Sequence, residues 1–171
     1  MTYIHDLKRV HDLLDEMFFD HQKALIHFEF DKALTLLEMY QAVLLRHMQD
    51  EELILLPVYS ERAKFSGAGA PKLFFDDHEK MRQYIEFFKK KTAELRCSLD
   101  LDKTLLQLLD REAFYLRLCS HHDKRETNFL YPILEEILSD DEKYDLMSRV
   151  NLNGHSIPES RSVASGRGGL M

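Results

Sequence analysis

The sequence contains few residues that interrupt helices. Of its six glycines, four lie after residue 150, and the other two, Gly67 and Gly69, lie close together in the segment KFSGAGAP. Before residue 150 the chain is otherwise rich in Leu, Glu, Lys, Met and Ala, which have high helix propensity or little tendency to break a helix. This scarcity of helix breakers predicts an all-α domain.

Cysteine is also scarce, since Cys97 and Cys119 are the only two and there is no CxxC motif. The first ten residues, MTYIHDLKRV, lack the apolar segment of a signal peptide, and no apolar run approaches the length of a membrane span. We therefore expect a protein of the reducing cytoplasm without a membrane partner. The net charge of -7, with His neutral, argues against nucleic acid as a partner.

Apolar residues recur at helical spacing along four long segments of the chain. We expect these segments to form helices over residues 3–28, 32–62, 71–96 and 100–138. Asp31 is expected to cap the second helix, and Pro71 suits the first turn of the third. A short helix over 139–150 would complete one domain, residues 1–150, followed by a mobile tail over 151–171. Four long helices with short connections predict an antiparallel up-down-up-down four-helix bundle.

One stretch of the chain occurs twice. Residues 47–59 read HMQDEELILLPVY and residues 122–134 read HDKRETNFLYPIL, so each has His, then Glu four residues later and Pro ten residues later. On a helix, positions i and i+4 lie one turn apart on the same face, so each copy presents an imidazole and a carboxylate together. Because the apolar periodicity continues beyond Pro57, we expect this proline to kink its helix rather than end it.

The positions of the turns indicate which other histidines lie level with the two motifs. Helices rise ~1.5 Å per residue, so residues equally distant from the turn of an antiparallel hairpin lie at the same height. His78 and His122 are each 22 residues from a turn centred near residue 100, and His11 and His47 are similarly placed about a turn near residue 29 or 30. His21 is the alternative on the first helix, although it would lie ~15 Å along the axis from that level.

These levels define a predicted metal site of four histidines and two glutamates: His11, His47, Glu51, His78, His122 and Glu126. Imidazole and carboxylate ligands suit two non-haem iron ions bridged by the glutamates, and manganese or a mixed pair fits nearly as well. Charged glutamates within apolar stripes are also hard to place without a cation. Six side chains on two octahedral ions leave positions for water or a small ligand, in a pocket that the surrounding Leu and Phe would keep small and dry.

Three further polar positions near the stripes leave alternatives open. Tyr40 and Tyr115 each lie seven residues before the histidine of a motif. We expect them to pack in the core, and the alternative is a hydrogen-bonded layer beside the site that includes His21. Asp15 follows His11 by four residues, yet it is as easily placed on the solvated face of the helix.

The pattern H…HxxxE…H…HxxxE over residues 3–138, with a proline after each HxxxE, resembles the hemerythrin-like family. This resemblance implies a four-helix bundle with a carboxylate-bridged di-iron site at the six residues given above. Oxygen-carrying hemerythrins have a second histidine on the third helix, four residues from the first, whereas Phe74 and Arg82 occupy the flanking positions here. They also have HxxxxD on the last helix, where this chain has HxxxE. The ligand set is similar to that of bacterial hemerythrin-like proteins and repair-of-iron-centres proteins.

We therefore expect a protein that binds oxygen or nitric oxide at a di-iron site for sensing, scavenging or delivery. The alternative is an enzyme that uses the same open positions: a peroxidase, a nitric oxide reductase or an iron–sulfur repair factor. Its partner would be a gas or peroxide, and the sequence names no redox partner. A ferritin-like oxidase is disfavoured because that family needs ExxH on two helices, and no histidine here follows an acidic residue by three positions. The absence of HExxH argues against a zinc hydrolase.

Overall fold

The computed structural model describes residues 4–150, and this range is helical along nearly all of its length. Its α-helices are α1 (Lys8–Ile26), α2 (Phe30–Asp50), α3 (Leu56–Arg62), α4 (Pro71–Glu94), α5 (Leu101–Arg125), α6 (Tyr131–Ile137) and α7 (Asp140–Arg149). No strand occurs within the described range, which confirms the all-α class. None of its helices is both long and apolar enough to cross a bilayer. The tail expected over 151–171 lies outside the described residues.

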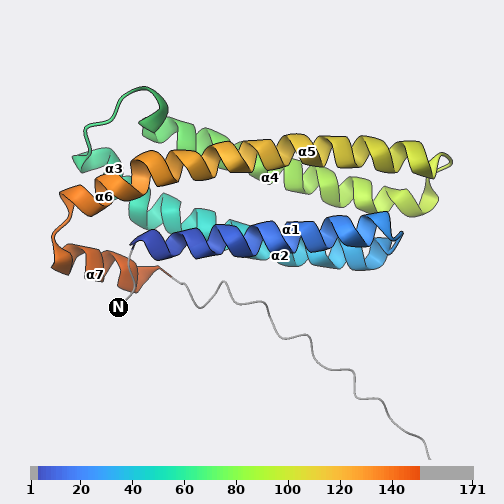
Figure 1. Cartoon of the computed structure of the whole chain (residues 1–171), viewed down its shortest axis with the longest axis horizontal. Helices are drawn as coiled ribbons and strands as arrows, with labels where there is room; N and C mark the ends of the chain where they lie inside the picture. The colour runs from blue at the N-terminus through green and yellow to red at the C-terminus, as the bar shows by residue number, and fades with distance from the viewer. Residues whose placement is uncertain (1–3, 151–171) are drawn as a thin grey trace, which may run out of the picture.

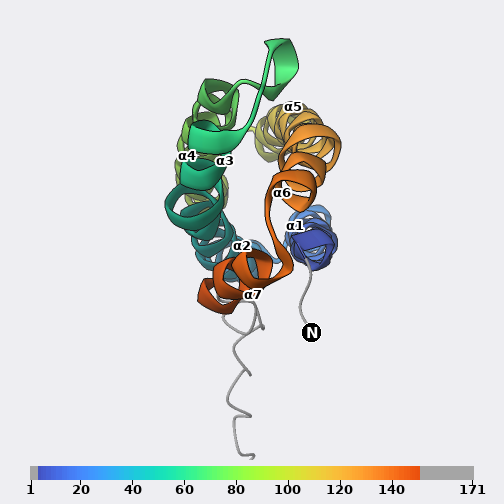
Figure 2. The ribbon, with the colours of Figure 1, turned by 90° about the vertical axis from the view of Figure 1, so that its left-hand side faces the viewer.

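The four long helices α1, α2, α4 and α5 lie side by side along the long axis of the molecule (Figures 1 and 2). Helix α1 packs against α2, α2 against α4 and α4 against α5, while α1 and α5 touch at fewer places. The short helices α3, α6 and α7 gather at one end of this arrangement (Figure 1). Side chains that point inward from all four long helices can therefore meet between them.

Two helical segments each contain a π-helical turn that begins at the glutamate of an HxxxE motif. Glu51–Leu55 joins α2 to α3, and Glu126–Leu130 joins α5 to α6. Pro57 and Pro132 lie in the first turn of the α-helix that follows. A proline has no N–H to donate and its ring collides with the carbonyl four residues earlier, so a wider π turn before it relieves the collision. Pro57 therefore does not end the helical segment, as expected, and a π turn comes before the proline in both repeats.

The ends of three helices show which capping predictions hold. Pro71 lies in the first turn of α4, as expected. The prediction that Asp31 caps α2 is wrong, because the helix begins at Phe30 with Glu29 at the N-cap position, and Asp31 instead pairs with Arg96. The expected short C-terminal helix is α7, which starts with a capping box between Ser139 and Glu142.

Two apolar clusters fill the interior, and a band of polar residues separates them. On α4, for example, Phe74 belongs to the cluster near α3 and α6, Met81 belongs to the cluster near the α1–α2 connection, and His78 lies between the two. For α1, α2 and α5, the residues of the second cluster lie just beyond the helix, as with Leu7 before α1, Ile54 after α2 and Leu130 after α5. Four of the five buried histidines in the described range, His11, His47, His78 and His122, therefore lie between the two apolar clusters, whereas His21 is buried elsewhere.

Candidate metal centre

The four histidines that were expected at one level meet in two pairs. Nε2 of His11 lies 2.8 Å from Nε2 of His47, and Nε2 of His78 lies 3.1 Å from Nε2 of His122. All four side chains are buried. The sequence placed His11 level with His47, and His78 level with His122, because the two members of each pair are equally far from a turn. The structure brings the same pairs together, one between α1 and α2 and the other between α4 and α5. Their role as metal ligands stays a prediction.

Two glutamates, Glu51 and Glu126, lie between the histidine pairs and are fully buried. In each glutamate, one carboxylate oxygen faces one histidine pair and the other oxygen faces the second pair. Glu126 Oε2 lies 3.0 Å from Nε2 of His11, and Glu126 Oε1 lies 2.6 Å from Nε2 of His122. Glu51 Oε1 lies 3.5 Å from Nε2 of His47, and Glu51 Oε2 lies 3.3 Å from Nε2 of His78. Each carboxylate is therefore placed to bridge the two pairs.

The six side chains form two overlapping groups, in each of which the ligand atoms all lie within 4.8 Å of one another: His11, His47, Glu51 and Glu126, and Glu51, His78, His122 and Glu126. The two glutamates belong to both groups. Two imidazoles for each group and two shared carboxylates are a donor set for a pair of metal ions bridged by carboxylates. These buried groups could therefore hold metal.

Two buried carboxylate oxygens test whether this donor set fits a cation. Glu51 Oε2 accepts no hydrogen bond from any residue in the described part of the chain, and Glu126 Oε1 receives none of regular geometry, although Nε2 of His122 lies 2.6 Å from it. Burying an ionised carboxylate costs several kcal/mol unless a cation or hydrogen-bond donors compensate it. A metal ion at each group would bind these oxygens and remove that cost, so the residues present fit the ions that the donor set implies.

The outward nitrogen of His78 contacts an acidic residue that the sequence pattern had not singled out. Nδ1 of His78 lies 2.9 Å from Oε1 of Glu52, and Arg82 donates to both oxygens of Glu52 at 2.7 and 2.8 Å. A carboxylate at Nδ1 holds the proton there, which leaves the Nε2 lone pair free to bind metal. Arg82, noted in the sequence only as a position without histidine, therefore holds the partner of His78 in place.

His122 and His11 also have acidic neighbours at Nδ1, but at distances beyond hydrogen-bonding range. Nδ1 of His122 lies 3.6 Å from Asp77, whose carboxylate pairs with Arg125. Nδ1 of His11 lies 3.6 Å from Asp123. Asp77 directly precedes His78 and Asp123 directly follows His122, so sequence proximity to a candidate ligand was a weak signal for both. Their function as partners depends on contacts between different helices, which spacing along the chain does not reveal.

Tyr131 connects the two glutamates. Its hydroxyl lies 3.1 Å from Oε1 of Glu51 and 2.9 Å from Oε2 of Glu126, and all three side chains are buried. The residue at the same position of the first repeat is Leu56, so this contact exists only in the second copy. Comparing the two copies for differences as well as for identities would have drawn attention to Tyr131.

The protonation of the cluster follows from burial and from its mixture of charges. Burial lowers the pKa of His11, but nearby carboxylates, Glu126 foremost, outweigh burial and raise this pKa to about 9. Burial also lowers the pKa of His122, and again the charge of Glu126 outweighs it, so the pKa lies well above its ordinary value. Burial, with the charge of Glu126, raises the pKa of Glu51 well above its ordinary range. Burial and the charge of His122 lower the pKa of His78 to about 4. A metal that binds here must displace protons.

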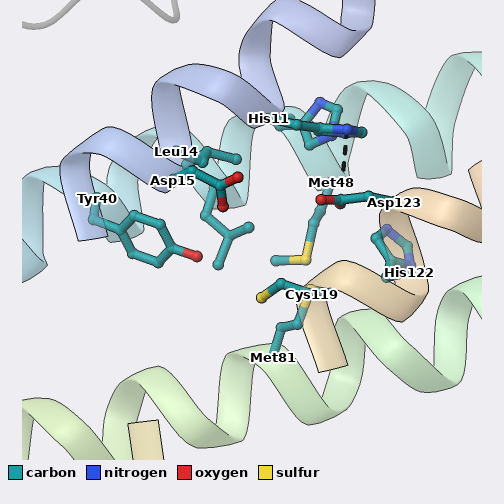
Figure 3. A pocket seen from close by; sticks show the side chains of 11 residues that line it. His11, Leu14, Asp15, Tyr40, Met48, Met81, Cys119, His122 and Asp123 are labelled. Carbon is teal, nitrogen blue, oxygen red and sulfur yellow. Dashed lines mark hydrogen bonds and ion pairs between the residues drawn. The ribbon is translucent and has the colours of Figure 1, made fainter. Parts of the chain in front are cut away.

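A cavity of about 20 Å³ adjoins the centre (Figure 3). Three of the histidines line it, together with eight further residues: Leu14, Asp15, Tyr40, Leu44, Met48, Met81, Cys119 and Asp123. This volume holds about one water-sized molecule. Asp15 is an exposed residue as well as part of the lining, so the cavity reaches the surface beside α1.

The remaining polar candidates lie outside both groups. Nδ1 of His21 donates to the carbonyl of Ala33 at 2.8 Å, and its Nε2 lies 2.9 Å from Glu112, so this histidine has a separate buried partner. The Tyr40 and Tyr115 hydroxyls lie 2.6 Å apart within the core. Tyr40 and Tyr115 therefore pack in the core, as expected, and they also form a hydrogen bond with each other. Tyr40 lines the cavity as well.

Comparison of the chain with family models, with curated proteins and with solved structures finds no match. The chemistry of the centre is therefore inferred from its own residues. Those residues provide two adjacent groups of nitrogen and oxygen atoms that could hold metal, and a small cavity lies between them and the surface.

Proposed function

We propose that this chain is a hemerythrin-like di-iron protein that binds oxygen or nitric oxide for sensing, scavenging or delivery. The observation that carries this proposal is the pair of buried groups that share Glu51 and Glu126. Imidazole and carboxylate together suit iron, and manganese suits the same set nearly as well, so metal content is the first quantity to measure. The resemblance of the H…HxxxE…H…HxxxE pattern to the hemerythrin-like family supports iron.

The proposed architecture is an up-down-up-down four-helix bundle made of α1, α2, α4 and α5. The packing of α1 on α2, of α2 on α4 and of α4 on α5 supports this arrangement, as do the short connections between α1 and α2 and between α4 and α5. In such a bundle, ligands from all four helices point toward a common axis, which suits a two-metal centre in the core.

The cavity supports a small ligand rather than a bulky substrate. Two imidazoles and two shared carboxylates leave open positions on a six-coordinate ion, and bound iron would supply the change in oxidation state that ligand binding needs. The chain would contribute the ligands, orient His78 through its hydrogen bond to Glu52, and line the adjacent cavity with apolar side chains such as Leu14 and Leu44. A cavity of about 20 Å³ suits a diatomic molecule.

Catalysis at the same centre is the second candidate. The opening of the cavity at Asp15 favours it, because water and a second reactant could reach the centre by the route that admits the first ligand. A peroxidase, a nitric oxide reductase or an iron–sulfur repair factor would each require such access. Binding is preferred because the cavity holds about one small molecule at a time.

The di-iron proposal is tested by reconstituting the protein anaerobically with ferrous iron and then oxidising it. We expect about two iron ions per chain, as two groups of ligands require, and the near-ultraviolet absorption of a bridged ferric pair. Parallel reconstitution with manganese compares the two metals. Fewer than about one iron per chain, with no such absorption, would contradict the proposal.

Binding and catalysis are separated by mixing the reduced protein with oxygen, nitric oxide or hydrogen peroxide. A spectral change that reverses when the gas is removed, without net consumption, supports the binding function. Repeated consumption of the gas or of peroxide in the presence of a reductant supports the enzyme instead.

A further inference from the structure

The charge of the cavity wall sets it apart from an ordinary apolar pocket. Among the residues that line it, Asp15 and Asp123 are acidic, and none that the structure describes there is lysine or arginine. Asp15 comes from α1 and Asp123 from α5, and Figure 3 shows both carboxylates turned toward the region between these helices. An incoming molecule therefore passes two carboxylates before it reaches the histidines, and it meets no lysine or arginine among the described lining residues.

The two acids lie along the route from solvent to the histidines. Asp15 is exposed, whereas the side chain of Asp123 is 31% exposed and lies 3.6 Å from Nδ1 of His11. Helices α1 and α5 also touch at fewer places than the other neighbouring pairs of long helices. The mouth of the cavity is consequently at Asp15, and Asp123 lies further in, beside the proposed metal centre.

This arrangement affects neutral and anionic ligands differently. A small anion is repelled by both carboxylates, and the repulsion is stronger at a site partly removed from water than in bulk solvent. A neutral diatomic molecule carries no net charge and also gains from contact with apolar lining such as Leu14, Leu44 and Met81. The wall therefore discriminates by charge between ligands of similar size.

We propose that Asp15 and Asp123 make the centre selective for neutral diatomic ligands and against small anions such as azide. The inference rests on the proposed function, because both kinds of ligand would bind at the metal centre. It assigns Asp15 as a residue that determines specificity without a hydrogen bond or ion pair to any of the six candidate ligands in the described structure.

The test uses Asp15→Asn and Asp15→Lys, which remove and then reverse the charge at the mouth. Glu16→Gln is the matched control, because Glu16 is exposed on the same helix and does not line the cavity. Each protein is first shown to contain the same amount of iron as wild type. The ferric form is titrated with azide and the reduced form with nitric oxide, both followed by absorption at one fixed pH and low ionic strength.

We expect Asp15→Asn to bind azide about three- to tenfold more tightly than wild type, and Asp15→Lys to bind it more tightly still. The affinity for nitric oxide should stay within about twofold in all variants, and Glu16→Gln should match wild type for both ligands. Added salt should reduce the differences in azide affinity, because the mouth is exposed to solvent.

Equal azide affinity in wild type, Asp15→Asn and Asp15→Lys at equal iron content would overturn the inference and leave the proposed function intact. An equal gain in Glu16→Gln would overturn it as well, since net charge rather than the cavity wall would then be responsible. If the wild-type chain takes up no metal, the proposed function fails and this inference fails with it. Metal content therefore distinguishes the two failures.

Discussion

At the scale of single residues, the orientation of the imidazoles is set by the protein itself. Three of the four histidines direct Nε2 into the centre and Nδ1 toward an acid, in the pairs His11–Asp123, His78–Glu52 and His122–Asp77. Two of these acids are held in turn by arginines. The hydrogen bond to Glu52 orients the ring of His78 before a metal arrives, while the nearby carboxylates of Asp123 and Asp77 favour the protonated forms of His11 and His122.

Replacing His11 by alanine should remove one metal ion and leave the other. His11 belongs to only one of the two groups of ligands, so the iron content should fall from about two to about one per chain, as measured by elemental analysis. His21→Ala is the matched control, since His21 is buried on the same helix but contacts Glu112 instead. Iron lost from the His21 variant and retained in the His11 variant would show that the histidines are paired wrongly.

The metal-free protein should lose stability as the pH rises from about 6.5 to about 9. The folded state binds the proton of His11 more tightly than the unfolded state, because the pKa is raised from 6.5 to about 9. This contribution, on the order of 3 kcal/mol, is therefore complete below pH 6.5 and is lost as the pH passes the folded value. The raised pKa values of His122 and Glu51 act in the same direction.

Thermal unfolding of the chelator-treated protein across this pH range measures the effect. The metal-loaded protein should show much less of it, because metal replaces the protons on its ligands. A melting temperature of the metal-free protein that stays constant or rises between these pH values would contradict the assignment of charges in the cluster.

At the scale of helical elements, each HxxxE motif ends in a π turn that begins at its glutamate. Such turns are uncommon within α-helices and are frequent at functional sites. Here the proline six residues after the glutamate accounts for the turn, because it prevents the regular hydrogen bond and crowds the preceding backbone. The shared proline offset in the two repeats thus has a structural cause next to the proposed ligands.

Replacing Pro132 by alanine should weaken metal binding with little effect on folding. Alanine restores an N–H donor and allows a regular α-helical register, so the backbone at Glu126 should shift. We expect metal affinity to fall about tenfold, as when residues that orient ligands are lost, while the stability of the metal-free protein changes by less than ~1 kcal/mol. Competition with a chelator measures the affinity, and chemical denaturation measures the stability.

Pro71→Ala is the control for this prediction, because Pro71 also lies in the first turn of a helix but has no π turn before it. Its metal affinity should equal that of wild type. Unchanged affinity in Pro132→Ala, or an equal loss in both variants, would show that the π turn does not position Glu126.

At the scale of the whole molecule, the proposed centre joins all four long helices. His11, His47, His78 and His122 come from α1, α2, α4 and α5 respectively. Bound metal would therefore connect α1 with α5, which touch each other at fewer places than the other neighbouring pairs. Metal binding should stabilise the folded state as a unit, since the unfolded chain does not present the ligands together.

Removal of metal should lower the melting temperature by about 10 °C. A metal at about a thousand times its dissociation constant adds about 4 kcal/mol, and each kcal/mol shifts the melting temperature of a domain of this size by about 2–4 °C. Calorimetry of the iron-loaded and chelator-treated protein at one pH measures the difference. Glu51→Gln/Glu126→Gln is the control, because it should melt at the same temperature with and without iron. Identical melting of the two wild-type forms would argue against a metal in the core.

Much of the candidate site could be predicted because it depends on helix geometry alone. A fixed rise per residue placed His78 level with His122 and His11 level with His47, and the structure brings these pairs within about 3 Å. The same helical rise placed His21 too far along the helix axis to share a metal site with His47. The failed cap at Asp31 shows a limit of this reasoning, because the end of a helix depends on local competition between several hydrogen bonds and ion pairs.

The sequence by itself determined the helical class and the level at which six polar side chains converge, since both follow from residue spacing along single helices. Only the tertiary structure decided what surrounds them. The partners Glu52 and Asp77, the hydroxyl of Tyr131 between two glutamates, and the acidic mouth formed by Asp15 and Asp123 all depend on which faces of different helices pack together. Spacing along one helix carries no information about rotation and side-chain contact between helices, so these features appear only when the helices are packed.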